Sequence, residues 1–304
     1  MSTGQAELLL AAVIAARSVS YLFEKIGLES MEPFTLLGIR FFMAFVFLSL
    51  LFWRKLWKAG RSAIASSALL GGVLFCVMAC ELLGLRTVSS SMASFLENTA
   101  IVFVPLFEAF LRRCWPQPRD ILVSGAILLG VALLVFQPGS LMGGAAIGTV
   151  YCLLAAVLYA VWIIATGCSA RQESPLIVGV LSLGFVSLFS MGAALLFESV
   201  ILPSAPEQWG ILLVLSFVCS AFGFTLQPVA QRYVSVERAG MFCALNPVAA
   251  AALGWLFLGE RMDIFGLIGA GIIIGSLLLS QKRGAAPADA GEINIPVKEK
   301  SLTL

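Results

Sequence analysis

The chain of 304 residues contains no histidine, and charged residues make up only 12% of it. The lack of histidine excludes an HExxH metalloprotease and a histidine proton relay, and no GxxxxGK[ST] loop is present to bind a nucleoside triphosphate. The sequence also shows no paired carboxylates, no nucleophile with a base and no metal triad. We therefore predict a protein that is not an enzyme, with no catalytic residues and no cofactor.

The seven cysteines indicate neither a disulfide framework nor a metal centre. Five lie in apolar segments, and Cys114 and Cys168 lie at the turns between segments. No pair of cysteines lies in the predicted outer loops, where oxidation to a disulfide is expected. Cys76 and Cys80 stand four residues apart on one helix face, but without histidine this spacing does not indicate zinc. We interpret the cysteines as packing residues and predict no metal site.

Apolar residues are abundant instead. They make up 60% of the chain, and the mean hydropathy is +1.00, whereas soluble domains are typically less than half apolar. Windows of about 20 residues predict membrane-spanning helices. The predicted spans are 6–26, 34–53, 63–83, 89–111, 121–137, 147–167, 176–197, 209–230, 239–258 and 264–281. The fold class is thus an all-α polytopic membrane protein with ten transmembrane helices and short loops.

Matching prolines indicate an internal repeat. Pro33 opens the second apolar segment and Pro175 the seventh, 142 residues apart. Pro105 lies inside the fourth segment and Pro247 inside the ninth, again 142 residues apart. Two sets of five segments in the same order are typical of transporters built from related halves.

The number of spans per half determines the orientation of the halves. Because five is odd, the second half must cross the membrane upside down relative to the first. The prediction is two inverted five-helix repeats, 1–143 and 144–283, whose central site opens alternately to either side. Residues 284–304 are rich in alanine, proline and small polar residues, which predicts a disordered cytoplasmic tail.

The placement of lysine and arginine predicts the membrane topology. With the N-terminus in the cytoplasm, twelve of the nineteen basic residues fall in inner loops, and only Lys25, Arg86 and Arg261 fall in outer loops. We therefore predict a multi-pass protein of the plasma (inner) membrane with both termini cytoplasmic. The net charge of +2 does not indicate a nucleic-acid partner.

A few ionisable residues lie at membrane depth, where they are costly and commonly functional. At about 1.5 Å per residue, Arg17, Arg40 and Glu97 lie about 10 to 13 Å below the outer boundary. They form one layer, with Glu97 as the deepest carboxylate. An alternative is that Arg40 and Glu97 form an ion pair that only fixes helix packing. Glu81 lies near a helix end, so we expect it to reach the interface.

Polar residues at helical spacing extend this layer outward. The stripes consist of Arg17, Ser20, Tyr21 and Glu24 on the first segment and of Ser90, Ser94 and Glu97 on the fourth. Both stripes open toward the outside. They are typical of the walls of a hydrated path that ends at the charged layer.

The second half contributes aromatic residues in place of charges. Tyr159 and Trp162, followed by Thr166, lie three and four residues apart on the sixth segment. A charged wall facing an aromatic wall suits a small zwitterion or an amphipathic organic molecule. The prolines in the fourth and ninth segments are expected to interrupt those helices and free carbonyl groups near Asn98 and Asn246.

Several motifs together resemble the EamA family of the drug/metabolite transporter superfamily. They are Met92–Leu96, Val102–Pro105, Gln227, Gln231, Ala244–Val248 and the Leu-Gly-Glu-Arg end of Leu256–Arg261. The resemblance covers about residues 6–281 and implies ten spans in two inverted repeats and export of metabolites or drugs. One departure is Asn246, which stands where the family often has an acid before the proline.

The resulting hypothesis is a secondary transporter that exports small organic solutes, with amino acids or related metabolites favoured, by alternating access. Its candidate substrate-binding residues are Arg17, Tyr21, Arg40, Ser94, Glu97, Asn98, Tyr159, Trp162, Gln227 and Asn246. Two alternatives stay open, namely an exporter of drugs or hydrophobic cations and a passive solute pore. Glu97 is the candidate for proton coupling. The small-residue face of Gly271 and Gly275 in the tenth helix is a candidate homodimer surface.

Overall fold

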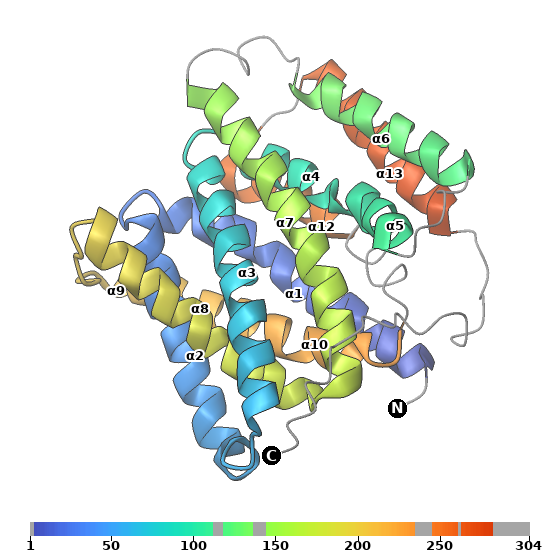
Figure 1. The fold of residues 1–304 in the computed structure, drawn as a ribbon. Coiled ribbons are helices and arrows are strands. Elements are labelled where there is room, and N and C mark those ends of the chain that lie inside the picture. The colour runs from blue at the N-terminus through green and yellow to red at the C-terminus, as the bar shows by residue number, and fades with distance from the viewer. Residues whose placement is uncertain (1–2, 112–117, 136–143, 235–244, 261–262, 282–304) are drawn as a thin grey trace.

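The computed structural model describes residues 3–111, 118–135, 144–234, 245–260 and 263–281, and the regular secondary structure of these residues is entirely helical (Figure 1). The elements are α1 (Thr3–Gly27), α2 (Pro33–Leu56), α3 (Arg61–Leu85), α4 (Ser90–Asn98), α5 (Ala100–Leu111), α6 (Pro118–Val135), α7 (Gly144–Gln172), α8 (Pro175–Phe197), α9 (Pro206–Leu213), the π-helix η1 (Val214–Phe224), α10 (Thr225–Gln231), α12 (Leu245–Leu258) and α13 (Ile264–Gln281). The predicted all-α class is confirmed. The predicted tail, 284–304, lies outside the described residues.

Seven helical stretches among the described residues are long and apolar enough to cross a membrane. They are Gly4–Gly27, Pro33–Leu56, Arg61–Leu85, Ser90–Leu111, Ala146–Ala170, Pro175–Phe197 and Pro206–Gln231. Three shorter apolar stretches, Ile121–Gly130, Ala249–Leu258 and Ile264–Ser276, fall in the predicted fifth, ninth and tenth spans. Every predicted span therefore contains an apolar helix.

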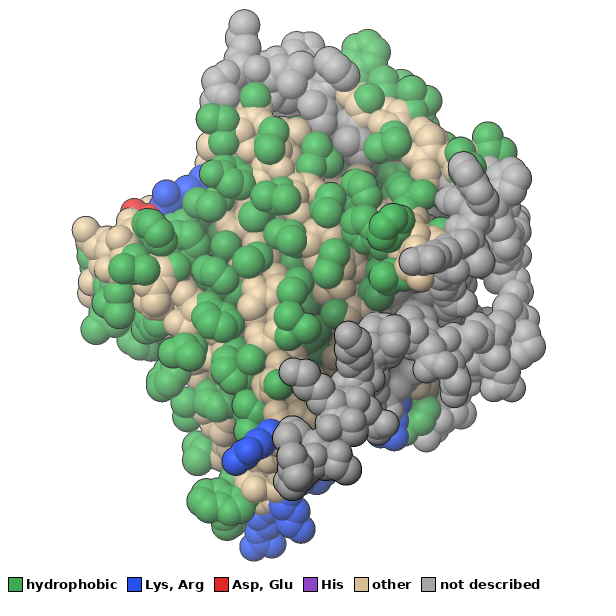
Figure 2. All heavy atoms as spheres, viewed as in Figure 1, with side chains coloured by type: hydrophobic (Ala, Val, Ile, Leu, Met, Phe, Trp, Pro, Cys, Tyr) green, Lys and Arg blue, Asp and Glu red, His purple; other side chains and the backbone are tan. Residues whose placement is uncertain are grey.

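The surface has the polarity expected of a protein surrounded by lipid. Hydrophobic side chains cover the face seen in Figure 2, and basic side chains gather at one end of it. The last turn of α2, the turn that follows it and the first residue of α3 expose Arg54, Lys55, Lys58 and Arg61. Apolar side chains such as Leu50 and Leu196 are exposed along the helices. Such exposure is unfavourable in water but favourable in a bilayer.

The two prolines that define the repeat start equivalent helices, as predicted. Pro33 is at the beginning of α2 and Pro175 is at the beginning of α8. Proline is favoured there because its missing N–H would have no partner in the first turn and its φ is already helical.

Equivalent helices from the two halves pack side by side in opposite directions. Gly38 near the start of α2 accepts a hydrogen bond from Ser187 of α8 at 3.0 Å, while Phe45, further along α2, lies against Gly184. A Cβ atom on Gly38 would lie 2.8 Å from the sulfur of Met191 and 3.4 Å from its backbone nitrogen, so the two helices approach closely at this glycine. α2 and α8 therefore run antiparallel.

The remaining packing is reciprocal between the halves. α1 contacts η1 and α12, and its counterpart α7 contacts α3 and the pair α4 and α5. The fifth predicted span also packs on the tenth, because α6 contacts α13 (Figure 1). At this contact a Cβ atom on Gly130 would lie 2.8 Å from the carbonyl oxygen of Gly269. The halves thus share one interface along most of their helices, as a two-fold arrangement requires.

Two glutamates of the second half cap helices of the first half. Glu198, just after α8, accepts hydrogen bonds from the backbone nitrogens of Phe34 and Thr35 at 2.7 and 2.8 Å. Glu260, just after α12, accepts them from the backbone nitrogens of Ser90 and Ser91 at 2.7 and 3.0 Å. A carboxylate at a helix N-terminus satisfies free N–H groups and interacts favourably with the helix dipole. We refer to these contacts as the glutamate caps.

The caps provide a stability test. Glu198→Ala removes the acceptor from the start of α2, so we expect it to lower the free energy of unfolding by about 1 to 2 kcal/mol. Thermal unfolding of the detergent-solubilised protein measures this change. The exposed Glu207, in the first turn of α9, offers the matched control Glu207→Ala. Equal melting temperatures for the two variants would contradict a stabilising role for the cap.

The break in the fourth span lies at Thr99 and not at Pro105, contrary to the prediction. α4 ends at Asn98, and α5 begins at Ala100 and continues past Pro105. The side chains of Asn98 and Thr99 hydrogen-bond to backbone oxygens of Ser94 and Leu96, both at 2.7 Å. Such side chains compete with the backbone for helical partners, which accounts for the break. Pro247 lies in the first turn of α12, and residues 239–244 of that span lie outside the described residues.

Candidate functional site

Arg17 of α1 lies at the centre of a site formed by both halves. Its guanidinium group donates hydrogen bonds to the hydroxyl of Tyr159 on α7 and to Oε1 of Gln227 on α10, the latter at 3.1 Å. The side chain is 4% exposed. A buried charge with partners on two helices of the opposite half connects the halves electrostatically as well as by packing. The structure thus brings together three residues that the sequence placed in separate segments.

Aromatic rings surround the Arg17 guanidinium. Its central carbon lies 4.1 Å from the ring centroid of Phe224 and 5.0 Å from that of Tyr159. Tyr159 stacks on Trp162 with centroids 5.7 Å apart, and Trp162 contacts Phe224 edge to face at 5.9 Å. Cation–π contacts of this kind stabilise a cation away from water. The predicted charged and aromatic walls therefore meet directly.

The π-helix η1 supplies the part of the site that sequence reasoning missed. Phe224 is its last residue, and the preceding Gly223 allows α1 to approach, because a Cβ there would lie 2.7 Å from Cγ of Arg17. π-helical turns are rare and are frequent at functional sites. The one signal of this part of the site in the sequence was Gly223 beside Phe224 in the eighth predicted span.

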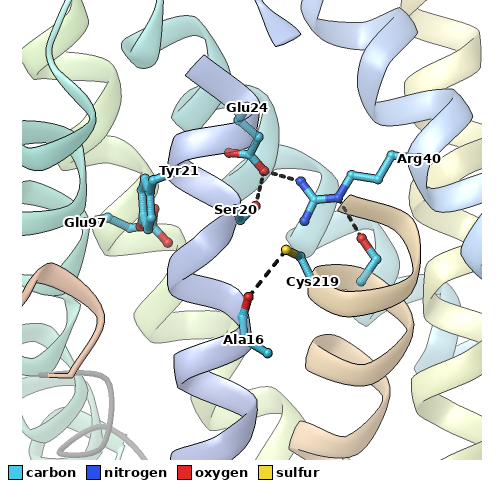
Figure 3. A network of polar contacts seen from close by, with 8 residues as sticks. Ala16, Ser20, Tyr21, Glu24, Arg40, Glu97 and Cys219 are labelled. Atoms are coloured by element: carbon cyan, nitrogen blue, oxygen red, sulfur yellow. Dashed lines mark hydrogen bonds and ion pairs between the residues drawn. The ribbon is translucent and has the colours of Figure 1, made fainter. Parts of the chain in front are cut away.

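Arg40 pairs with Glu24, not with Glu97 (Figure 3). Both side chains are fully buried. Glu24 Oε1 also accepts a hydrogen bond from Ser20 at 2.5 Å, and Arg40 Nε donates to Ser220 of η1 at 2.6 Å. The suggested pair of Arg40 and Glu97 is therefore wrong. The sequence did not reveal that Arg40 and Glu97 lie on opposite sides of α1 (Figure 3).

Glu97 instead accepts a hydrogen bond from the hydroxyl of Tyr21 at 2.6 Å. In Figure 3 these two residues lie across α1 from the Arg40 pair. Oε1 of Glu97 has no hydrogen-bond partner among the described residues. Glu81 is 3% exposed, so the expectation that it reaches the interface is wrong.

Ser94 and Asn98 are buried but bond within their own helix. Ser94 Oγ donates to the carbonyl oxygen of Ser91 at 2.7 Å, and Asn98 Nδ2 donates to that of Ser94 at 2.7 Å. Asn98 Oδ1 has no hydrogen-bond partner among the described residues. The same holds, within that part of the chain, for the indole nitrogen of Trp162 and both side-chain polar atoms of Gln231. Buried polar atoms rarely lack partners, so these atoms are available to a polar solute or to water.

The model of the EamA-like transporter family matches the chain twice, over residues 4–136 and 146–281. The chain belongs to the EamA-like transporter family. It is accordingly a multi-pass membrane transporter and not an enzyme. The two matches also divide this EamA chain into duplicated halves, which agrees with the repeat found in the sequence.

Relatives extend over the whole EamA region. An uncharacterized transporter of Archaeoglobus fulgidus is 28% identical over 282 residues, which cover 90% of this chain and 96% of the relative. The uncharacterized inner membrane transporter YedA of Escherichia coli K12 is 25% identical over 270 residues, covering 86% and 85% of the two chains. A protein of known crystal structure shares the fold, with a TM-score of 0.68, 17% identity and coverage of 91% and 98%.

Asn246, where this EamA chain departs from the acid often found before the proline, accepts a hydrogen bond from Ser18 at 2.6 Å. The contact joins α12 to α1 one residue after Arg17. Asn246 is thus placed beside the site as a neutral group. The acidic groups near Arg17 come from the first half instead, through Glu97 and Glu81.

Proposed function

We propose that this transporter exports small zwitterionic solutes, amino acids in particular, by alternating access between two inverted five-helix halves. The observation that carries the proposal is Arg17, a first-half cation whose hydrogen-bond partners Tyr159 and Gln227 belong to the second half. Rocking of the halves would change these contacts, and with them the affinity of the site.

The chemistry of the site supports a zwitterion. Arg17 matches a carboxylate, and Glu97 with Tyr21 matches an ammonium group. The ring surfaces of Trp162 and Phe224 can cover an apolar side chain. A solute of this type would place each charge beside an opposite one, which a buried site requires.

Alternation is favoured over an open pore by the contacts at one end of the bundle. In the proposed topology, with both termini in the cytoplasm, the glutamate caps of Glu198 and Glu260 lie at the outer side. There they connect the halves, together with Gln208, which bonds the carbonyl oxygen of Ser30 at 3.4 Å. A transporter held closed at the outer side must exchange these contacts to release solute outward.

The test is exchange in liposomes. Purified protein is reconstituted, the vesicles are loaded with an unlabelled amino acid, and entry of the same labelled amino acid is followed across a panel of the twenty standard ones. We expect saturable exchange for at least one zwitterionic member. Absence of exchange across the panel by folded protein would overturn the solute class, and unitary conductance steps in planar bilayers would favour the pore.

A second candidate is export of hydrophobic cations. It is favoured by the cluster of Tyr159, Trp162 and Phe224 together with the buried carboxyl groups of Glu81 and Glu97. Tetraphenylphosphonium in the same vesicle assay distinguishes the candidates. Its exchange, without exchange of any amino acid, would assign the cation class to this site.

The inverted topology needs its own measurement. Single cysteines at Arg54 and Gln208, introduced into a variant without native cysteine, are labelled from outside intact cells by a reagent that does not cross membranes. We expect label at position 208 and none at position 54. Equal labelling would contradict the proposed orientation. The homodimer through Gly271 and Gly275 also stays a prediction, and a Cβ atom on either glycine would meet nothing within 4 Å among the described residues.

A further inference from the structure

Three exposed cations gather where α2 passes into α3, far along the chain from the residues of the Arg17 site. They are Lys55 in the last turn of α2, Lys58 in the turn that follows and Arg61 at the start of α3, and we refer to them as the basic patch. The sequence has no acidic residue between Glu32 and Glu81. Within the part of the chain that the structure describes, no carboxylate forms an ion pair with the patch. Its positive charge is therefore available to an anion from outside the protein.

Two tryptophans accompany the patch. Trp53 and Trp57 are 58% and 87% exposed, which is unfavourable for large rings in water. Indole rings favour the level of a membrane at which the headgroups meet the acyl chains. The guanidinium carbon of Arg54 lies 5.6 Å from the ring centroid of Trp53, so this cation lies at the level of the indole. These contacts indicate that the end of α2 lies among lipid headgroups.

The residues just before the patch have the polarity of acyl chains. Leu50 and Leu51 are 73% and 61% exposed, and α2 is kinked at Phe52, directly before Trp53. From Leu50 to Lys58 the surface thus changes from aliphatic to aromatic to cationic. A phospholipid has the same order of groups, namely acyl chains, glycerol esters and phosphate. The match favours a membrane lipid over a soluble anion, which has no apolar part to place against the leucines.

The equivalent turn of the second half has no such patch. It lies between α8 and α9, and its residues 198–205 include no lysine or arginine. Its acidic residue, Glu198, caps α2, and Ile201 and Leu202 are exposed. The repeated fold therefore forms this turn without basic residues. In the proposed inverted topology the two turns lie at opposite ends of the bundle, so the patch would meet only the cytoplasmic leaflet.

We propose that the basic patch binds the phosphate of an anionic phospholipid of the cytoplasmic leaflet, with Trp53 and Trp57 against the glycerol and the upper acyl chains. The inference does not depend on which solute is transported. Each cation of the patch should strengthen binding about fivefold, because a lysine or arginine near an anionic lipid surface contributes about 1 kcal/mol. Phosphatidylcholine carries an ammonium group beside its phosphate, so the patch should bind it more weakly than phosphatidylglycerol.

Thermal unfolding of the detergent-solubilised full-length protein measures this preference. We expect added phosphatidylglycerol to raise the melting temperature until the site is saturated, because a ligand of the folded state stabilises it by mass action, and phosphatidylcholine to raise it less. Lys58→Gln combined with Arg61→Gln should weaken the apparent affinity for phosphatidylglycerol about 25-fold. Arg232→Gln, at an exposed position just after α10, should leave that affinity unchanged.

Three results would overturn the proposal. They are equal stabilisation by the two lipids, an unchanged affinity in the double variant, and an equal effect of soluble glycerol 3-phosphate, which would assign the patch to a free phosphate compound.

Fluorescence quenching locates the lipid without altering any charge. Phosphatidylglycerol with brominated acyl chains, present as a minor component of phosphatidylcholine liposomes, should quench the tryptophan fluorescence of the protein more than brominated phosphatidylcholine does at the same fraction. We expect this excess quenching to disappear when Trp53→Phe and Trp57→Phe are combined. Trp209→Phe alters a ring that is 42% exposed on α9 and should keep the excess. Excess quenching that persists without Trp53 and Trp57 would place the lipid elsewhere and contradict the site.

Discussion

Replacing Arg17 with methionine is expected to reduce amino-acid exchange by about two orders of magnitude, because loss of a buried hydrogen-bonded charge commonly costs 2 to 5 kcal/mol of binding. Methionine keeps most of the side-chain length but cannot bond Tyr159 or a solute carboxylate. Initial exchange rates in proteoliposomes, measured below saturation, provide the comparison.

Two further variants make this result specific. Arg17→Lys keeps the charge but loses the planar group that lies over Phe224, so we expect it to recover only part of the activity. Arg54→Met alters an exposed arginine in the last turn of α2 and should transport like the wild type. If Arg17→Met also exchanged amino acids at the wild-type rate, Arg17 would have no place in the solute site.

Glu24→Gln is expected to have the largest effect on stability. It leaves the Arg40 charge buried without its partner, and breaking a buried ion pair in this way costs about 3 to 5 kcal/mol. The measurement is the loss of folded, monodisperse protein on heating in detergent. Among single substitutions in the bundle, this one should lower the yield of the purified protein most.

The double variant separates charge from packing. Combining Glu24→Gln with Arg40→Met removes both charges, and we expect it to recover most of the lost stability, because a pair of neutral residues carries no desolvation penalty. Should the double variant be less stable than Glu24→Gln alone, the bonds of Arg40 to Ser220 would matter more than its charge.

Patterns that depend on one helix at a time were readable in the sequence. The starts of α2 and α8 at Pro33 and Pro175 follow from the chemistry of proline, and the apolar segments follow from the thickness of the bilayer. The depth expected for Arg17 also follows from helical rise, because depth needs only a count of residues, and it stays a prediction.

Features that depend on how helices face each other were not readable. Whether Arg40 meets Glu24 or Glu97 is decided by the rotation of α1 and α2 about their axes. The hydrogen bond of Tyr21 to Glu97 likewise joins two helices that the sequence treats separately. The π-helix that ends at Phe224 follows from no propensity, since an added residue per turn leaves the composition unchanged.

The glutamate caps have a consequence for biogenesis. The N-termini of α2 and α4 are synthesised long before Glu198 and Glu260 leave the ribosome. Their free N–H groups therefore have to wait for hydrogen-bond acceptors from later in the chain. The nascent first half is therefore an incomplete folding unit. α2 reaches its final state only after Glu198 has been inserted, and α4 only after Glu260 has been inserted.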